Sequence, residues 1–388
     1  MAVNVVIIGA SVVGLNVAHS VLRDVPEAKV TLINPSPTFY FNIAAPRIVA
    51  KPQAFRPDQY LLPIPDAFAK YQENKFEFIA GTATAIDVNN KTVSVTPNGK
   101  DDAQPVSYDY LVIASGSTSA ATTGSITGSP IPFNQSKQDD MKQLVEAAQQ
   151  QIKDAREIVI GGAGPIGVEL AGELAEVVQQ SGNPVSITLV SATDRILPML
   201  KPTGSSAAQQ ILQQNKVKIL VSTRVTGVEA STDKASKAWT VSLDNGDTLS
   251  ADVYIPTTGA TPNNSFIPAQ FLDENGWVKV DSELHVLSEN SSLPIYAAGD
   301  ITNSSMRLAI KAAEQAPVVA ANLKNDILGK GCRRTYNQGD SLLMVVPVGE
   351  AGGTGLLYGM TPFNFMVKMV KSRDFFITKA GDMVAGKF

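Results

Sequence analysis

Two short glycine-rich runs carry the clearest chemical signal in this sequence. The later run reads Gly162-Ala163-Gly164-Pro165-Ile166-Gly167, which is the full Gly-x-Gly-x-x-Gly pattern. It stands between an apolar strand, "EIVI", and a helical run, "VELAGELAEVV". The N-terminus of such a helix presents free backbone N–H groups and a positive dipole end to a pyrophosphate. The sequence therefore predicts a dinucleotide site. The alternative is that these glycines serve only to let the strand and helix pack closely.

The earlier run has the same frame but departs from the pattern at its middle position. It reads Gly9-Ala10-Ser11-Val12-Val13-Gly14 and follows the apolar strand "NVVII". A middle glycine lets the backbone approach a pyrophosphate closely, whereas Ser11 adds a β-carbon and a hydroxyl. Two such turns in the same context favour nucleotide binding over packing alone. We predict nucleotide contacts at Gly9, Ser11, Val13 and Gly14.

The strand after each turn should end in a residue that binds a ribose. Asp or Glu is usual there, but this sequence has Asn34 after the first turn and Ser191 after the second. The absence of a carboxylate at position 191 removes the repulsion that would exclude the 2′-phosphate of NADPH, and Arg195 follows in the same loop. We predict that NADPH is tolerated or preferred. The alternative is that Arg195 is only a surface charge.

The elements around these turns form two similar units. Each has a strand, a glycine turn, a helix and a further strand, which is the βαβ unit of parallel nucleotide-binding sheets. Asp300 follows Gly299 at another strand end, where it would accept hydrogen bonds from a polyol or cap an ordinary turn. Residues 117–135 are rich in Ser, Thr, Gly and Pro and predict a connection between domains.

Composition narrows the class of protein. A chain of 388 residues exceeds the size of one hydrophobic core, and 44% hydrophobic with 18% charged residues is typical of a globular protein. The net charge of −4 gives no basic excess for nucleic acid. The single cysteine, Cys332, excludes an internal disulfide and a Cys-x-x-Cys motif. His19 and His285 are too isolated to suggest a metal site, so no metal is expected.

The two ends of the chain indicate where the protein is located. The N-terminus "MAVNVVIIG" enters a strand at once, so we expect no signal peptide or transmembrane helix and a cytoplasmic location. Near the C-terminus, "TPFNFMVKMVKSRDFFITK" mixes apolar side chains with Lys and Arg. It predicts an amphipathic helix that touches a membrane peripherally, for instance at a mitochondrion. The alternative is burial against the core or in a homodimer interface.

The ordered set of motifs resembles a known family. The first glycine turn, "YDYLVIASGS", "IGGAGPIGVELAGELA", "ADVYIPTTGATPN" and "IYAAGD" occur in the order of the flavoprotein reductases with two dinucleotide-binding domains. The resemblance covers essentially the whole chain. Two further stretches, "FYFNIAAPRIVA" and "MVKMVKSRDFF", are similar to the AIF-like branch with its ferroptosis-suppressor (AMID-type) quinone reductases, related to type II NADH dehydrogenases.

The resemblance implies an α/β fold of two Rossmann-like domains plus a smaller C-terminal α+β domain. The FAD-binding domain would be discontinuous, at 1–125 and 256–325. The NAD(P)H-binding domain would span 126–255, and a C-terminal domain at 326–388 would cover the flavin.

The resemblance also implies which residues bind the cofactors. The FAD pyrophosphate would lie over Gly9–Gly14 and its ribityl chain on Asp300, with further contacts at Asn34, Asn42, Arg47, Ala83, Ala114, Ser115, Gly116 and Gly299. NAD(P)H would lie on Gly162, Gly164, Pro165, Ile166 and Gly167, with Ser191 and Arg195 on its ribose side and Gly259 near the nicotinamide. Glu169, also near the nicotinamide, and Lys371 and Phe376, which match the flavin and quinone pocket, are the candidate catalytic residues.

The implied function is transfer of a hydride from NAD(P)H to FAD and of electrons onward to a quinone-type acceptor. Because the chain has no cysteine pair to relay electrons, the acceptor must meet the flavin directly. Two alternatives stay open: a reductase component for a ferredoxin-like carrier, and an apoptosis-related signalling flavoprotein that senses redox state. Ser11 and Asn34 both replace the usual residue at the predicted FAD site. We therefore predict that this site has weaker affinity on its adenosine side.

Overall fold

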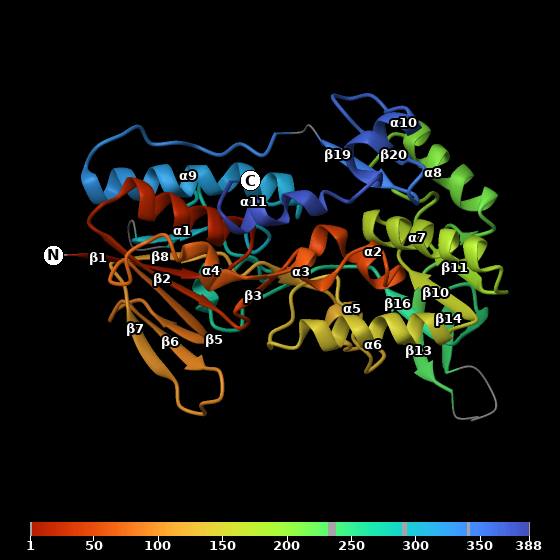
Figure 1. Cartoon of the computed structure of the whole chain (residues 1–388), viewed down its shortest axis with the longest axis horizontal. Coiled ribbons are helices and arrows are strands. Elements are labelled where there is room, and N and C mark those ends of the chain that lie inside the picture. The colour runs from red at the N-terminus through yellow and green to blue at the C-terminus, as the bar shows by residue number, and fades with distance from the viewer. Residues whose placement is uncertain (1, 232–237, 289–292, 340–341, 388) are drawn as a thin grey trace.

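Two sheets, the first mixed and the second parallel, form the framework of the protein, and one strand of each leads into a glycine turn (Figure 1). The computed structural model describes residues 2–231, 238–288, 293–339 and 342–387. The predicted order of strand, turn, helix and strand occurs twice. It comprises β1 (Val3–Ile8), α1 (Val12–Asp24) and β2 (Ala28–Asn34) in the first unit, and β10 (Glu157–Gly161), α7 (Pro165–Ser181) and β11 (Ser186–Val190) in the second.

The first sheet places β1 between β2 and β8 (Tyr110–Ile113), and the three strands run parallel. The chain therefore moves to opposite sides of β1, and open α/β sheets bind ligands at the carboxyl end of such a strand. The side chains of Val5 to Ile8 are at most 5% exposed, so both faces of β1 are covered. The full order is β18 (Ile295–Ala297), β8, β1, β2, β5 (Phe76–Asp87), β6 (Thr92–Pro97) and β7 (Gln104–Ser107).

The second sheet has the order β12 (Lys218–Leu220), β11, β10 and β16 (Val253–Pro256), and all its strand pairs are parallel. A separate antiparallel sheet comprises β13 (Val225–Ala230), β14 (Trp239–Leu243) and β15 (Thr248–Ala251). The helices of this half are α6 (Met141–Asp154), α7 and α8 (Pro202–Gln214).

One stretch of chain links the two halves, and another packs against the half to which it does not belong. The predicted connection at 117–135 begins with β9 (Ser117–Thr118) and α5 (Ala120–Thr123), and β9 pairs with β17 (Thr261–Pro262) on the return path. The segment after β2 contains α2 (Ala45–Ala50), which packs against α6 and α7 of the other half. The segment also includes β3 (Thr38–Tyr40), a 3-10 turn (Asn42–Ala44), α3 (Pro57–Tyr60), β4 (Leu61–Pro63) and α4 (Ile64–Phe68).

The C-terminal part of the chain contacts both halves. After α9 (Ala309–Leu328), which packs on α1, the hairpin of β19 (Met344–Pro347) and β20 (Gly353–Leu356) packs on α7 and α8. Beyond it come α10 (Asn364–Val367), a π-helix (Lys368–Ser372), a 3-10 turn (Ile377–Lys379) and α11 (Ala380–Val384), which packs on α1. The chain end thus crosses from the second unit to the first (Figure 1).

The amphipathic helix predicted near the C-terminus is wrong as a single continuous helix. Its regular part is only α10 and the π-helix, because Phe375 and Phe376 adopt left-handed backbone conformations with φ of +49° and +59°. Among the described residues, no helix combines the length and apolar character needed to cross a bilayer. The fold is α/β, with two Rossmann-like units and a smaller C-terminal α+β part, as predicted.

Candidate active site

Packing of the chain itself requires the outer glycines of the first turn. Gly9 has a φ of +105°, and a β-carbon on it would collide with the carbonyl oxygen of Ala114. A β-carbon on Gly14 would collide with the carbonyl oxygen of Gly9. The turn therefore lies directly against the carboxyl end of β8, with the predicted contact residue Ala114 beside it.

The middle residue of this turn faces solvent. Ser11 stands just before α1 with an ordinary φ of −115°, and its side chain makes no hydrogen bond to the helix N-terminus. Its hydroxyl is thus available to a ligand that lies over the turn. Val13 is buried, and its Cγ2 would lie 3.1 Å from a β-carbon on Gly299. The turn that carries Asp300 therefore adjoins the first glycine turn.

Asn34, the last residue of β2, holds the first turn in place through hydrogen bonds. Its Oδ1 accepts a hydrogen bond from the Ala10 amide at 3.0 Å, and its Nδ2 donates to the carbonyl oxygen of Ser36 at 2.8 Å. A carboxylate in this place would have no proton to give to the carbonyl oxygen of Ser36. Ala83 is buried on β5, just beyond Ala80, which pairs with Asn34.

A polar cluster lies at the carboxyl end of β8. The Ser115 hydroxyl donates to the carbonyl oxygen of Asn263 at 2.8 Å, and the Asn263 amide donates back to the carbonyl oxygen of Ser115 at 2.8 Å. Gly116 follows with a φ of +64°. The Asn263 Oδ1 is buried and has no hydrogen-bond partner among the described residues. This acceptor can be satisfied by a bound ligand with a donor group.

Asp300 lies close to the same cluster. Its carboxylate accepts a hydrogen bond from the Ser117 hydroxyl at 3.1 Å, and burial raises the pKa of Asp300 above its ordinary range. A half-buried carboxylate and an orphaned amide oxygen together suit a ligand that brings several hydroxyl donors, as the ribityl chain of FAD does. The residues present therefore fit the flavin.

The second turn differs from the first in having open space at its middle position. A β-carbon on Gly162 would lie 2.6 Å from Thr258 Cγ2, and one on Gly167 would collide with the carbonyl oxygen of Gly162. Gly164 has an ordinary φ of −75°, and no protein atom lies within 4 Å of where its β-carbon would be. Packing does not explain Gly164, whereas close approach of a pyrophosphate does. The turn therefore fits a dinucleotide.

The predicted ribose-side residues lie in the loop after β11. The buried Ser191 hydroxyl donates to the carbonyl oxygen of Arg195 at 2.9 Å, so it holds this loop in place. The Arg195 guanidinium donates to Asp194 at 3.2 Å and to the carbonyl oxygen of Pro198 at 3.1 Å. It is a partly exposed charge that already has a carboxylate beside it.

The remaining predicted residues around the second turn belong to different elements. Pro165 and Ile166 open α7, where proline suits the first helical position and Ile166 is 38% exposed. Gly259, which follows β16, has a φ of +70° and open space around it.

Two buried carboxylates on α7 face basic side chains from α2 and from the C-terminal segment. Glu169 and Glu173 are one turn apart and both lie in an otherwise apolar part of the helix. The Lys371 Nζ lies 2.6 Å from Glu169 Oε1. The Arg47 guanidinium makes two hydrogen bonds of 2.8 Å to Glu173, and these side chains are 2% and 0% exposed. Lys51 lies 3.0 Å from the same carboxylate.

These ion pairs set the electrostatics of the site. Burial raises the pKa of Glu169 above its ordinary value, and Lys371 opposes the shift by favouring the charged form. Glu169 is therefore a carboxyl group that can hold a proton more readily than an exposed one. Such a group near a reacting centre is suited to proton transfer.

Backbone strain marks the segment beside these charges. Phe375 and Phe376 are consecutive non-glycine residues in the left-handed region, which is costly and is typical of functional sites. The Arg47 guanidinium lies 4.7 Å from the centre of the Phe375 ring and donates to the carbonyl oxygen of Arg373 at 2.9 Å. Arg47 thus joins α2, α7 and the C-terminal segment, while Asn42 lies one turn earlier in the 3-10 turn before α2.

Sequence reasoning missed several residues of this site. Glu173, Lys51, Phe375 and Asn263 were not singled out, although each has a structural role here. The available signal was the pair of Glu169 and Glu173 at helical spacing in an apolar run, since buried carboxylates need buried cations. For Asn263 the only signal was its place in the motif "ADVYIPTTGATPN".

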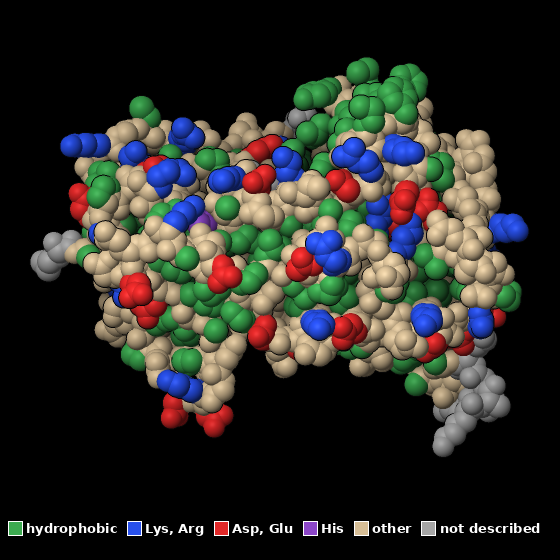
Figure 2. Space-filling model, in the orientation of Figure 1, with side chains coloured by type: hydrophobic (Ala, Val, Ile, Leu, Met, Phe, Trp, Pro, Cys, Tyr) green, Lys and Arg blue, Asp and Glu red, His purple; other side chains and the backbone are tan. Residues whose placement is uncertain are grey.

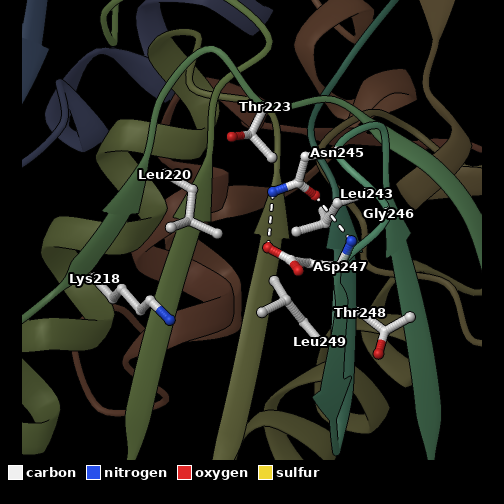
Figure 3. Close-up of a pocket in the computed structure, with 9 residues that line it drawn as sticks. All are labelled: Lys218, Leu220, Thr223, Leu243, Asn245, Gly246, Asp247, Thr248 and Leu249. Carbon is white, nitrogen blue, oxygen red and sulfur yellow. Dashed lines mark hydrogen bonds between the residues drawn. The ribbon is translucent and has the colours of Figure 1, made fainter.

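A separate polar pocket contains none of the predicted residues. It has a volume of about 530 Å³ and lies between β12 and the β14–β15 hairpin (Figure 3). Asn245 and Asp247 face each other in it at 2.8 Å. Its other lining residues are Lys218, Leu220, Thr223, Leu243, Gly246, Thr248 and Leu249. In the described part of the chain, no group of His, Cys, Asp and Glu is arranged to hold a metal ion.

Comparison with known proteins decides the family. Residues 3–316 match the family model described as pyridine nucleotide-disulphide oxidoreductase. The chain belongs to this family. It is an oxidoreductase whose cofactors are FAD and NAD(P)H, as predicted, and the geometry of the two turns described above fits both of them.

Individual relatives extend along nearly the whole chain. The oxidoreductase ptaL of Pestalotiopsis fici is 34% identical over 96% of this chain and 96% of that protein. The ferroptosis suppressor protein 1 of Xenopus tropicalis is 27% identical over 98% of this chain and 95% of that protein. Among solved structures, the sulfide:quinone oxidoreductase of Aquifex aeolicus superposes with a TM-score of 0.75 at 19% identity, over 98% of this chain and 92% of that one. At this identity the likeness shows the fold alone.

Proposed function

We propose that this oxidoreductase is of the AIF-like, ferroptosis-suppressor type and passes electrons from NAD(P)H through FAD to a quinone-type small molecule. The observation that carries the proposal is the junction of three segments on α7, the helix that follows the second turn. Lys371 from the C-terminal segment binds Glu169 on the nucleotide-binding helix, and Arg47 from the FAD-side segment binds Glu173 one turn further along that helix. Motifs from both halves and from the chain end therefore meet at one place.

The chain's own residues hold and orient the cofactors. The backbone amides of the first turn and the Ser11 hydroxyl would hold the FAD pyrophosphate, while Asp300 and Asn263 would accept hydrogen bonds from its ribityl chain. The amides around Gly164 would hold the pyrophosphate of NAD(P)H. The two bound cofactors would supply the hydride transfer and the electron transfer to the acceptor.

Glu169, Lys371 and Phe376 are the proposed catalytic residues. Reduction of a quinone takes up protons as well as electrons, and Glu169 can hold a proton because burial raises its pKa. Lys371, 2.6 Å away, stabilises the carboxylate after it gives the proton up. The ring beside the pair is that of Phe375, whose centre lies 5.3 Å from the Lys371 Nζ, and Phe376 follows it in the same strained backbone.

The acceptor is proposed to meet the flavin directly. Relay through a redox disulfide needs two cysteines, and the chain has only Cys332, which is exposed. A planar quinone can approach a flavin without such a relay.

The proposed domain division follows the strand pairing. The FAD-binding domain comprises 1–125 and 256–325, and its second part includes β18, which pairs with β8. The NAD(P)H-binding domain comprises 126–255, and β16, which pairs with β10, ends one residue past this boundary. The C-terminal domain comprises 326–388. A cytoplasmic location, a homodimeric state and the lack of a nucleic-acid partner are part of the same proposal.

Turnover with a panel of acceptors tests the proposed function. The purified, FAD-loaded protein is mixed with NADH or NADPH and with a soluble quinone, a ferredoxin or oxygen, and nucleotide oxidation is followed. We expect fast turnover with the quinone and at least equal efficiency with NADPH, because no carboxylate stands at position 191. Fast turnover only with ferredoxin would favour a carrier reductase. Slow turnover with every acceptor, together with nucleotide-dependent oligomerisation, would favour a signalling role. Better efficiency with NADH would contradict the nucleotide preference.

A further inference from the structure

A run of exposed apolar side chains stands out on the surface near the C-terminus. Of the thirteen large hydrophobic residues that are exposed in the described part of the chain, seven lie within residues 358–370. We name these seven the apolar cap. Tyr358, Phe363 and Met369 are 89%, 72% and 73% exposed. Figure 2 shows a dense group of hydrophobic side chains at the edge of the molecule, where Figure 1 places α10. The cap comprises Tyr358, Met360, Phe363, Phe365, Met366, Met369 and Val370.

The backbone of the cap is anchored so that its side chains point outward. The Lys201 Nζ donates a hydrogen bond to the carbonyl oxygen of Gly359, and the hydroxyls of Thr203 and Thr361 lie 2.8 Å apart. The Asn364 Oδ1 accepts a hydrogen bond from the Gly353 amide at 2.6 Å. These contacts join the cap to α8 and β20. Exposure of the cap is therefore a property of the folded chain, and a monomer normally avoids such a patch.

The charged side chains within the cap segment have one sign. Residues 351–373 contain no Asp or Glu, although the whole chain has a net charge of −4. Lys201, Lys368 and Arg373 are exposed at the border of the cap. The carboxylates that flank this stretch along the chain already have partners, since Glu350 lies 3.0 Å from Lys51 and Asp374 lies 3.9 Å from Arg373. The segment is thus apolar with only basic charges of its own, and the nearby carboxylates Glu176 and Glu350, which line a pocket with Lys368 and Arg373, are both paired with Lys51.

We propose that the apolar cap is a docking surface for an anionic lipid bilayer. Phe, Met and Tyr side chains would enter the boundary between headgroups and acyl chains, and the three basic residues would lie against the headgroups. A second copy of the chain fits less well, because a symmetric dimer through this face would bring the same basic side chains together. The cap only rests on the membrane surface, and the proposal holds whatever the electron acceptor is.

Binding to lipid vesicles tests this without turnover. The FAD-loaded full chain is floated with vesicles of phosphatidylcholine alone or of phosphatidylcholine mixed with phosphatidylserine. We expect it to float with the mixed vesicles, more weakly with phosphatidylcholine, and to dissociate at high salt. The double variant Phe363→Ser, Phe365→Ser should bind about tenfold more weakly or worse, because two exposed rings are lost from the interface.

A matched control removes apolar side chains elsewhere. Ile126 and Leu287 are 42% and 46% exposed and lie outside the cap, so Ile126→Ser, Leu287→Ser should float like the wild type. Thermal unfolding and the bound flavin show whether each variant is folded. The proposal is overturned if the wild type does not float with anionic vesicles, or if the cap variant floats as well as the control. A wild-type dimer that the cap variant converts to a monomer, without lipid binding, would instead assign the cap to an interface between copies.

Discussion

The ammonium group of Lys371 lies 2.6 Å from the carboxylate of Glu169, and this contact joins residues 202 positions apart in the sequence. Both side chains are largely buried, at 14% and 5% exposed. Glu169 belongs to the helix that follows the second glycine turn, while Lys371 belongs to the C-terminal segment. The pair therefore connects the nucleotide-binding half to the strained backbone at Phe375 and Phe376. Its removal affects both stability and the site.

Replacement of Lys371 by Met leaves the Glu169 carboxylate buried without its nearest cation. We expect a loss of about 3–5 kcal/mol in the free energy of unfolding, measured with urea. Glu169→Gln together with Lys371→Met should lose less, because no buried charge remains. Since burial raises the pKa of Glu169 in the folded state, unfolding releases its proton, and stability falls as pH rises through that pKa. The single variant Lys371→Met should therefore be less stable at about pH 8 than at about pH 5.

The control for this pair is an exposed one on the same segment. Lys379 lies 3.9 Å from Asp382 with both side chains more than 45% exposed, so Lys379→Met should change stability little. Equal losses in the single and double variants at Lys371, with no dependence on pH, would show that the pair does not stabilise the fold as argued.

Replacement of Gly164 by Ala tests whether this glycine is needed for nucleotide binding or for packing within the protein. Its β-carbon meets no protein atom and its φ is ordinary, so the variant should fold normally but bind NADPH about tenfold more weakly. Gly167→Ala should be unfolded or should lose several kcal/mol in its free energy of unfolding, because the new β-carbon collides with backbone atoms. Gly381→Ala, in open space on α11, is the matched control and should change neither property. Unaltered NADPH binding in Gly164→Ala would argue against a nucleotide at this turn.

Ser11 and Asn34 have different expected effects on FAD. Ser11→Gly should slow FAD dissociation, because it removes a β-carbon under the pyrophosphate without loss of a contact within the protein. Asn34→Glu should not tighten FAD, since a carboxylate cannot donate to the Ser36 carbonyl oxygen, and a loss of about 1–3 kcal/mol in stability is expected. Stopped-flow release of FAD measures the first effect. An unchanged rate for Ser11→Gly would disprove the predicted weakness on the adenosine side.

His19 makes the stability depend on pH. The ring is buried and stacks on Phe68, with ring centres 4.0 Å apart. Its Nδ1 accepts a hydrogen bond from the Tyr71 hydroxyl, and its Nε2 donates one to the carbonyl oxygen of Val384, each at 3.0 Å. Burial lowers the pKa of His19 from 6.5 to about 4. Because the unfolded chain takes up the proton first, the stability held above pH 6.5 falls by about 3 kcal/mol as pH drops to 4.

The variant His19→Gln isolates this effect. The difference in unfolding free energy between the wild type and the variant should shrink as pH falls through the window between 6.5 and 4. A difference that stays constant over that window would mean that His19 is not buried in its neutral form.

The glycine turns could be predicted from sequence because their requirements are local. Gly9, Gly14, Gly162 and Gly167 are fixed by contacts within one strand–turn–helix unit or its neighbouring strand, and these follow from the motif. The family resemblance supplied Glu169 and Lys371, but not the reason that they meet.

The rest of the site depends on contacts between distant segments. Arg47 meets Glu173 across 126 positions, and no pattern within either segment specifies the partner. The C-terminal helix was predicted too long for a similar reason. Its polarity pattern is helical, but the left-handed backbone at Phe375 and Phe376 accompanies contacts to Arg47, which local sequence does not contain.

The most direct test of the central claim is anaerobic reduction of the bound flavin by NADPH. The purified protein should contain about one FAD per chain, and its visible flavin absorbance should bleach when NADPH is added without any acceptor. A quinone added afterwards should restore the absorbance. A protein that cannot be loaded with FAD, or whose bound flavin neither NADPH nor NADH reduces, would contradict the account.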